Sequence, residues 1–306
     1  MVSSARPRYR FGPREFEAEG GSLTLQLTES NDILEDAGAL RSRLEDQGYL
    51  LVRQLHDRDE VLRVRHEVLE RMARRGQLDP RAPFMDGVIP PDLANAAGPG
   101  VREAAGLRSD SLKSLVYGPR IMSFFRRLFA DEPLNYQFEW LRTPGSGSTT
   151  PIHCDAVFMG RGTPRLLTCW TPLGDITADM GPLALCLGSH KLQQVIDSYG
   201  RSDVDRDLTA GYFTKDPAEL VERFGCRWAT TEFRAGDVVI LTMHLMHASL
   251  TNTSNRYRLS CDTRYQPASE PVDERWAGDK PIGHDRFWAP DVQLEPLEVS
   301  RRRWGV

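Results

Sequence analysis

Residues 236–258 read GDVVILTMHLMHASLTNTSNRYR, and this stretch decides the fold that we expect for the chain. The apolar run 238–241 follows a Gly-Asp turn, which is typical of a short buried β-strand. Polar residues come next, among them His247 and, eleven residues later, Arg258. A buried strand that leads into a histidine and an arginine indicates a β-rich core that carries a chemical site.

Short strand-like runs separated by turn signals surround this stretch. We expect strands at 136–142, 152–159, 165–171, 183–187, 229–233, 238–243 and 257–265. Turn residues such as Pro144-Gly145 and Gly181-Pro182 lie between them. Many short strands at this spacing are typical of a β-sandwich or barrel, so we predict a barrel or jelly roll with helices packed on it.

The first third of the chain mixes helix and strand. Helical spacing of apolar residues over 33–44 precedes an extended run at 49–52. Asp57 and Glu60 form a capping box for a further helix. Its apolar stripe would consist of Val61, Val64, Val68 and Met72. Further helical signals are Leu112 with Leu115 and the Gly118-Pro119 break, with Pro119 suited to a first helical turn.

We therefore predict one domain over 1–306. Residues 1–133 would form a mostly helical buttress, 134–266 the jelly-roll core and 267–306 a C-terminal extension. The Pro-, Gly- and Ala-rich residues 77–108 are expected to form a long loop at a substrate entrance. The polar insert at about 189–227 is expected to be partly helical.

Composition limits the function classes. The chain has 306 residues, 40% of them hydrophobic, which is enough for one large core. A net charge of -4 without a basic stripe argues against a nucleic-acid partner. No stretch has the length of a membrane span, and the N-terminus lacks a secretory signal. Five cysteines without a C-x-x-C pair indicate a reduced, cytoplasmic protein; the oligomeric state stays open.

His153 and Asp155 form the one His-x-Asp pair of the chain. In a strand both side chains would face the same way, and His247 is our candidate for a third ligand from a remote strand. Two histidines and a carboxylate on one face of an ion suit iron(II) that must also bind a cosubstrate and O2. The pair alone is also compatible with a core histidine and an edge carboxylate. His244, three residues before His247, is the rival third ligand.

Arg258 is the candidate anchor for a dicarboxylate cosubstrate. The planar guanidinium holds a carboxylate through two parallel hydrogen bonds. Arg256 and Arg264 are the alternatives, and a surface position for Arg258 would remove the argument.

The order and spacing of several motifs over about 134–266 resemble the phytanoyl-CoA dioxygenase family of iron(II)/2-oxoglutarate oxygenases. The motifs are His153-Cys154-Asp155, Trp170, Gly181-Pro182-Leu183, Gly188-Ser189-His190-Lys191, Gly236-Asp237 and the segment 247–258. The resemblance implies a double-stranded β-helix, the cupin-like jelly roll. It implies His153, Asp155 and His247 as iron ligands and Arg258 as the anchor for the distal carboxylate of 2-oxoglutarate. Ser249 and Trp170 fall where the family lines the cosubstrate pocket.

The resemblance also implies a reaction. Iron(II), 2-oxoglutarate and O2 would oxidise a C–H bond of a small organic metabolite, with release of succinate and CO2. Since Asp155 is present, hydroxylation is favoured over halogenation. No element points to a fatty acyl-CoA substrate. The rival hypotheses are a cupin-type metal enzyme that does not use 2-oxoglutarate and a non-catalytic binding protein on the same fold.

Substrate contacts are expected near the mouth of the barrel. Phe158, Met159, Arg161 and Arg165 follow the His-x-Asp pair. Arg161, flanked by glycines, either contacts an anionic substrate or lies in a surface turn, and we favour the surface turn. We expect Trp140 to pack in the core, and the Pro90-Pro91 segment is a candidate lid.

Overall fold

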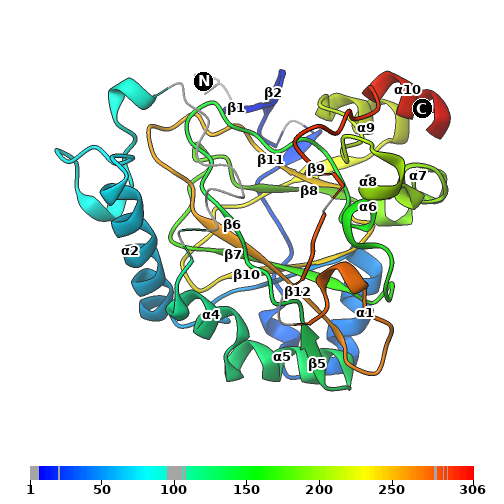
Figure 1. Cartoon of the computed structure of the whole chain (residues 1–306), viewed down its shortest axis with the longest axis horizontal. Coiled ribbons are helices and arrows are strands. Elements are labelled where there is room, and N and C mark those ends of the chain that lie inside the picture. The colour runs from blue at the N-terminus through cyan, green and yellow to red at the C-terminus, as the bar shows by residue number, and fades with distance from the viewer. Residues whose placement is uncertain are drawn as a thin grey trace, which may run out of the picture.

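The computed structural model describes residues 7–19, 21–94, 106, 108–278, 281–284, 286–287 and 289–306. Two β-sheets pack against each other, and helices cover the outer face of the larger sheet (Figure 1). This is the jelly-roll architecture that the strand pattern predicts, built from two facing sheets. None of the described helices combines the length and the apolar character that crossing a membrane requires.

The larger sheet has the order β4-β10-β7-β12-β5, and β6 also pairs with β12. Its strands are all antiparallel to their neighbours. They are β4 (Tyr49–Val52), β5 (Pro133–Asn135), β6 (Trp140–Arg142), β7 (Leu167–Pro172), β10 (Val238–Thr242) and β12 (Ser260–Pro267). In the register of this sheet Asp262 lies opposite Trp170 on one side and Trp140 on the other.

The smaller sheet has the order β11-β8-β9-β3. Its strands are β3 (Leu23–Thr24), β8 (Leu183–Leu187), β9 (Arg227–Ala229) and β11 (His247–Ser249). A separate hairpin is formed by β1 (Arg8–Phe11) and β2 (Arg14–Glu17). The two sheets meet in an apolar cluster to which Trp170 and Val239 of the larger sheet and Leu185 of the smaller sheet belong.

Among the described helices, those that cover the outer face of the larger sheet are α1 (Ala37–Gln47), α2 (Arg58–Arg74), α4 (Asp110–Tyr117) and α5 (Pro119–Phe129) (Figure 1). Asp57 caps α2 as expected, because its carboxylate accepts hydrogen bonds from the backbone N–H groups of Asp59 and Glu60. The predicted stripe of α2 is fully buried. Phe125 of α5 stacks on Tyr265 of β12 with ring centroids 4.0 Å apart.

The strands of the larger sheet have two buried faces of different character. On β12, Cys261 packs with α2 and α4, and Tyr265 packs with α5. The alternate residues Asp262 and Arg264 line a cavity between the sheets. On β12 the period of two therefore places polar side chains in the cavity and apolar ones under the helices.

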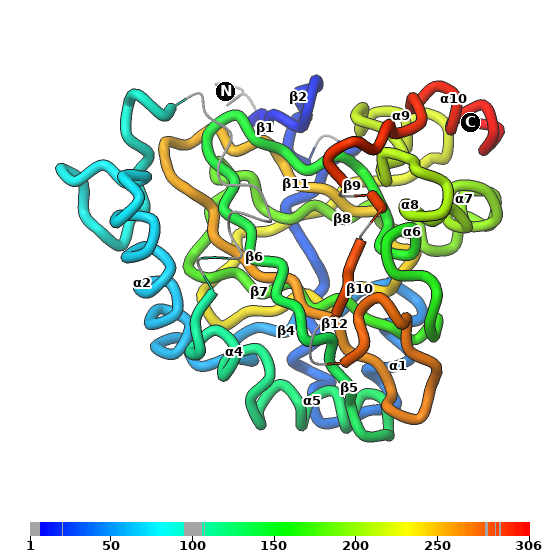
Figure 2. The backbone as a smooth tube through the Cα atoms, in the orientation of Figure 1, coloured from blue at the N-terminus to red at the C-terminus, as the bar shows by residue number. Residues whose placement is uncertain are grey.

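The remaining helices gather at one end of the sheets. They are α6 (Ala156–Met159), α7 (Gln193–Asp197), α8 (Val204–Asp207), α9 (Pro217–Phe224) and α10 (Leu297–Trp304). The insert at 189–227 is thus partly helical, as predicted. Figure 2 shows the C-terminal segment returning to this end, where α10 lies beside α9. Arg301 of α10 donates hydrogen bonds to Glu219 of α9.

Several strand predictions need correction. The strand expected at 152–159 is wrong, because residues Ala156–Met159 form the helical turn α6 and His153 lies in an isolated bridge. Strands were expected at 229–233 and 257–265, whereas the observed ones are Arg227–Ala229 and Ser260–Pro267.

The expected loop at 77–108 lies partly outside the described residues, at 95–105 and 107. Its described part holds the short turns Phe84–Asp86 and Pro91–Leu93. Pro90 lines a cavity of its own beside Pro83 and Leu78, separate from the residues proposed for the site. The lid predicted for the Pro90-Pro91 segment is therefore not supported.

Candidate metal centre

His153, Asp155 and His247 come together between the two sheets. Their ligand-type atoms all lie within 4.8 Å of one another, and within the described residues this is the one group of three or more such side chains able to hold a metal ion. The Nε2 atom of His153 lies 3.8 Å and that of His247 lies 4.0 Å from Oδ1 of Asp155. His244, the rival third ligand, is not part of this group.

Both imidazoles are oriented by the backbone. Nδ1 of His153 lies 2.9 Å from the carbonyl oxygen of Pro151, and Nδ1 of His247 lies 3.0 Å from that of Leu245. Because a carbonyl only accepts, each Nδ1 must carry the proton and donate it. The lone pair of each ring is then on Nε2, which faces Asp155. Burial lowers the pKa of His153 to about 3, so that this imidazole is neutral at physiological pH.

Asp155 is held through one of its two oxygens. Thr168 on β7 donates a hydrogen bond to Oδ2, and Nη2 of Arg264 lies 3.2 Å from the same atom. Oδ1 is left to face the histidines. Burial by itself would raise the pKa of Asp155, but the charge of Arg264 and the hydrogen bond from Thr168 hold that pKa below its usual range. The carboxylate is therefore ionised and acts as an acceptor.

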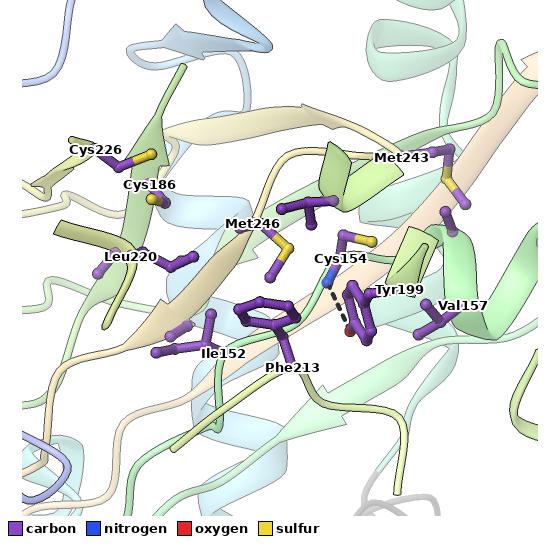
Figure 3. Close-up of a cluster of buried hydrophobic side chains, with 14 of the residues drawn as sticks. Ile152, Cys154, Val157, Cys186, Tyr199, Phe213, Leu220, Cys226, Met243 and Met246 are labelled. Carbon is purple, nitrogen blue, oxygen red and sulfur yellow. Dashed lines mark hydrogen bonds between the residues drawn. The ribbon is translucent and has the colours of Figure 1, made fainter. Parts of the chain in front are cut away.

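Cys154, between the two candidate ligands, points away from them. Figure 3 shows its side chain in an apolar cluster with Phe213 and Met246, beside Tyr199. The backbone N–H of Cys154 donates to the hydroxyl of Tyr199, which in turn donates to the carbonyl of Gly211. The packing of Cys154 in this cluster holds the backbone of residues 153–155. His153 and Asp155, on either side of Cys154, therefore face the opposite way, toward the cavity.

Arg258 is a buried cation without a counter-ion. Its side chain is 3% exposed, its Nε has no hydrogen-bond partner, and no carboxylate of the described residues lies within ion-pair distance of it. Burial lowers its pKa to about 10, which still leaves it charged. Its guanidinium carbon lies 6.0 Å from the ring centre of Trp170. An unpaired buried cation is costly, so this position indicates a site for an anion.

The two alternative arginines have other partners. Arg256 is 47% exposed in its side chain and lies 3.9 Å from Asp86 on the surface. Arg264 is committed to Asp155 and stacks on Trp140 at 4.2 Å. Among the three candidates, Arg258 alone is buried and unpaired.

Two adjoining cavities surround these residues. The inner cavity holds the triad together with Arg258, Ser249 and Trp170. The outer cavity has a volume of about 510 Å³ and a largely aromatic lining that includes Phe158 and Phe287. The two share the walls formed by Arg142, Thr150, His153, Asp155 and Arg264. A volume of this size suits a small organic molecule, which would meet the triad at the common wall.

A family model of phytanoyl-CoA dioxygenase (PhyH) matches residues 44–260, well over half of the chain. This chain belongs to the phytanoyl-CoA dioxygenase family. The motifs over 134–266 resemble the same family, so the protein is a non-haem iron, 2-oxoglutarate-dependent oxygenase.

Curated relatives of this phytanoyl-CoA dioxygenase family member include two hydroxylases. The 1-deoxypentalenic acid 11-beta-hydroxylase of Streptomyces exfoliatus is 26% identical over 252 residues, covering 78% of this chain and 83% of the relative. The enzyme of the same name from Streptomyces arenae is 25% identical over 254 residues, with the same coverage.

Solved structures share the fold. The epimerase SnoN from nogalamycin biosynthesis, in complex with Fe3+, alpha ketoglutarate and nogalamycin RO, superposes with a TM-score of 0.55 at 22% identity, covering 86% of this chain and 93% of SnoN. EctD from S. alaskensis superposes with a TM-score of 0.53 at 20% identity, covering 89% of this chain and 92% of EctD. Both support the jelly-roll assignment for this family member.

Sequence reasoning missed several side chains of the site in this phytanoyl-CoA dioxygenase family member. They are Thr168, Asp262 and Arg142, which line the inner cavity, and Arg264, which was considered only as a rival of Arg258. The available signal was the alternation of polar residues along 258–266, which faces the inside of the molecule. Register then brings Arg264 opposite Thr168.

The substrate-contact expectations divide into two groups. Phe158 and Met159 line the outer cavity as expected, and Trp140, expected in the core, is buried but lines it too. Arg161 instead makes a two-point ion pair with Asp203, at 2.7 and 2.9 Å, and lines a different cavity. Arg165 pairs with Glu270 at 2.5 Å. Neither arginine lines the outer cavity, which agrees with the surface turn favoured for Arg161.

Proposed function

We propose that this protein hydroxylates a C–H bond of a small, largely apolar metabolite, using iron(II), 2-oxoglutarate and O2 and releasing succinate and CO2. In this proposal His153, Asp155 and His247 bind the iron. Arg258 binds the distal carboxylate of 2-oxoglutarate, and Ser249 and Trp170 line the cosubstrate pocket.

The donor set of the triad supports an iron site. Two neutral imidazole nitrogens and one carboxylate oxygen face a common point, and each has its other polar atom engaged elsewhere. Such second contacts fix the orientation of the ligand and raise its basicity. Iron held by these three side chains would keep positions open for a chelating cosubstrate and O2.

The buried and unpaired Arg258 is the observation that carries the 2-oxoglutarate assignment. It lines the same cavity as the triad, and a dicarboxylate that chelates the metal at one end needs a cation at the other. Ser249 supports this pocket as well. Its oxygen accepts a hydrogen bond from the N–H of Thr150 at 2.8 Å, which leaves its own proton available for a carboxylate.

Iron with 2-oxoglutarate and O2 supplies the oxidant, and one oxygen atom of O2 enters succinate while the other enters the substrate. The protein's own residues position the reactants. The triad and Arg258 fix the cosubstrate, and the aromatic outer cavity excludes water and holds a C–H bond near the triad. No side-chain general base is required.

The named activity of the two Streptomyces relatives supports hydroxylation of a small metabolite. The unpaired Arg258 in the metal cavity favours a dicarboxylate cosubstrate over a cupin-type enzyme that does not use 2-oxoglutarate. A non-catalytic binding protein would have no need for three oriented ligands.

Anaerobic addition of iron(II) and 2-oxoglutarate to the folded protein tests the proposal. We expect a weak visible charge-transfer band that requires both additions, and succinate formation once O2 is admitted with a substrate. A folded protein that binds iron but forms no band on addition of 2-oxoglutarate would favour the cupin-type alternative.

A further inference from the structure

The positive and negative charges of the side chains around the two cavities do not sum to zero. Among the described residues, arginines 142, 258 and 264 line them, against aspartates 155 and 262. The histidines are counted as neutral here: His153 and His247 would bind iron as neutral imidazoles in the proposed function, and burial lowers the pKa of His284. Three positive charges against two negative ones leave one positive charge in a region that is largely buried.

The proposed iron and cosubstrate do not remove this excess. Iron(II) brings two positive charges and 2-oxoglutarate brings two negative ones, so together they are neutral. One positive charge therefore remains at the common wall of the cavities. Uncompensated charge in a desolvated site is unfavourable, and a bound anion of single charge would neutralise it.

Arg142 is the arginine available for such an anion. Arg258 is assigned to the cosubstrate. Arg264 holds Asp155 through Nη2; its Nε and Nη1 have no hydrogen-bond partner, but its side chain is only 3% exposed and its guanidinium lies over Trp140. Arg142, on β6, uses Nε to contact Oδ2 of Asp262 at 2.9 Å, and no described residue is a partner of its two Nη groups. Its side chain is 31% exposed, so a ligand can reach it. It lines both cavities.

The rest of the outer cavity is suited to hydrocarbon. Phe158, Met159 and Phe287 contribute apolar surface, and Trp140 forms the wall next to Arg142. A ligand that fills this space meets the partly exposed guanidinium of Arg142, close to the triad, and mostly apolar surface elsewhere.

We propose that the substrate is a largely apolar monocarboxylic acid and that Arg142 binds its carboxylate. A carboxylate is planar and singly charged, which matches the paired donors of a guanidinium and the charge to be neutralised. The inference rests on the proposed function, since it takes the iron and 2-oxoglutarate as bound. It adds the class of substrate and the residue that selects it.

A matched pair of probes tests this without turnover. Adamantanecarboxylate and adamantanecarboxamide have nearly the same size and shape and differ in charge. Both are titrated calorimetrically into the anaerobic protein loaded with iron(II) and 2-oxoglutarate, alongside cyclohexanecarboxylate and its amide. We expect each carboxylate to bind about tenfold or more tightly than its amide.

Substitutions show which residue is responsible for the preference for carboxylate over amide. Arg142→Gln is expected to bring the carboxylate-to-amide ratio close to one, and Arg142→Lys is expected to retain part of it. Arg161→Gln is the matched control, because Arg161 is paired with Asp203 and lines another cavity. It should keep the wild-type ratio.

Three results would overturn the inference. The first is the absence of any carboxylate preference in wild-type protein, including failure of both acids to bind. The second is an unchanged preference in folded Arg142→Gln. The third is an Arg142→Gln variant that still prefers carboxylate over amide but binds 2-oxoglutarate more weakly. That result would assign Arg142 to the cosubstrate. The visible band of the wild-type complex tests the proposed function separately, so the two failures are distinguishable.

Discussion

His153 and His247 exchange two backbone hydrogen bonds: the N–H of His153 donates to the carbonyl of His247 at 3.1 Å, and the N–H of His247 donates to that of His153 at 2.8 Å. Their ring centres lie 4.3 Å apart. The separation of the two imidazoles is therefore fixed by main-chain pairing between segments far apart in the sequence. A site held in this way is preorganised for a metal before the metal arrives.

Removal of one imidazole is predicted to abolish metal binding without unfolding the protein. In His153→Ala the backbone bridge to His247 remains, while one of three ligand atoms is lost. We expect stoichiometric iron binding and all turnover to disappear, measured by metal analysis and succinate formation. His244→Ala is the control and should bind iron like wild type. If His244→Ala lost iron and His153→Ala kept it, the ligand set would be wrong.

Replacement of Arg258 is predicted to weaken 2-oxoglutarate binding by roughly one to two orders of magnitude, the usual size of a hydrogen bond to a charged group. The effect should fall on KM for 2-oxoglutarate more than on kcat, because the contact exists in both ground and transition states. Arg258→Gln is compared with Arg256→Gln, whose arginine lies on the surface beside Asp86. An unchanged KM in Arg258→Gln with a raised KM in Arg256→Gln would contradict the assignment.

Arg264 is predicted to position Asp155. Its Nη2 holds Oδ2 of that carboxylate and its guanidinium lies over Trp140. Arg264→Met should weaken iron binding roughly 10- to 100-fold, as expected for a partner of a metal ligand. Thr168→Val, which removes the other donor to Oδ2, should act in the same direction. Iron titration of both variants checks this, and wild-type affinity in both would show that Asp155 needs neither contact.

Asp205 is predicted to hold one wall of the outer cavity. Its carboxylate accepts hydrogen bonds from Arg275 at 2.6 Å, from Nδ1 of His284 at 2.8 Å and from the N–H of Phe287 at 3.0 Å. Asp205→Asn should raise KM for the organic substrate while iron and 2-oxoglutarate binding stay unchanged. Asp207→Asn, paired with Arg206 nearer the surface, is the control. Equal substrate KM in the two variants would contradict this role.

The same carboxylate gives a pH prediction. Burial would raise the pKa of Asp205, but hydrogen bonds from His284, Phe287 and Arg275 outweigh it and hold that pKa below its usual value. A group with a lowered folded-state pKa stabilises the fold above its unfolded pKa of about 4 and loses that contribution as pH falls further. Acid unfolding of wild type should therefore be steeper below about pH 4 than that of Asp205→Asn. Acid-denaturation curves of equal steepness for wild type and Asp205→Asn would contradict this prediction.

The sequence was sufficient to predict a helix or strand where the apolar pattern and the turn or capping residues agree. The strands Tyr49–Val52 and Leu183–Leu187 were predicted with their observed bounds, since short apolar runs stand between clear turn signals. The helix Arg58–Arg74 was found from its cap and its apolar stripe. These elements depend on neighbours in the chain.

The sequence was insufficient where tertiary contacts decide. After His153 the chain turns into the helix Ala156–Met159. Two sets of tertiary contacts hold this turn: Asp155 accepts hydrogen bonds from Thr168 and Arg264, and the N–H of Ala156 donates to the carbonyl of Met243. Alternating polar residues on β12 usually indicate a solvent face, whereas here that face is the cavity wall. The partners of Asp155 were missed for this reason.

The central claim is that one iron ion is bound by His153, Asp155 and His247 with 2-oxoglutarate reaching Arg258. Anomalous diffraction at the iron edge, from crystals grown anaerobically with iron(II) and 2-oxoglutarate, measures this directly. We predict one peak at coordination distance from Nε2 of both histidines and Oδ1 of Asp155, with cosubstrate density that extends to Arg258. A peak elsewhere, or cosubstrate density that ends away from Arg258, would contradict the account.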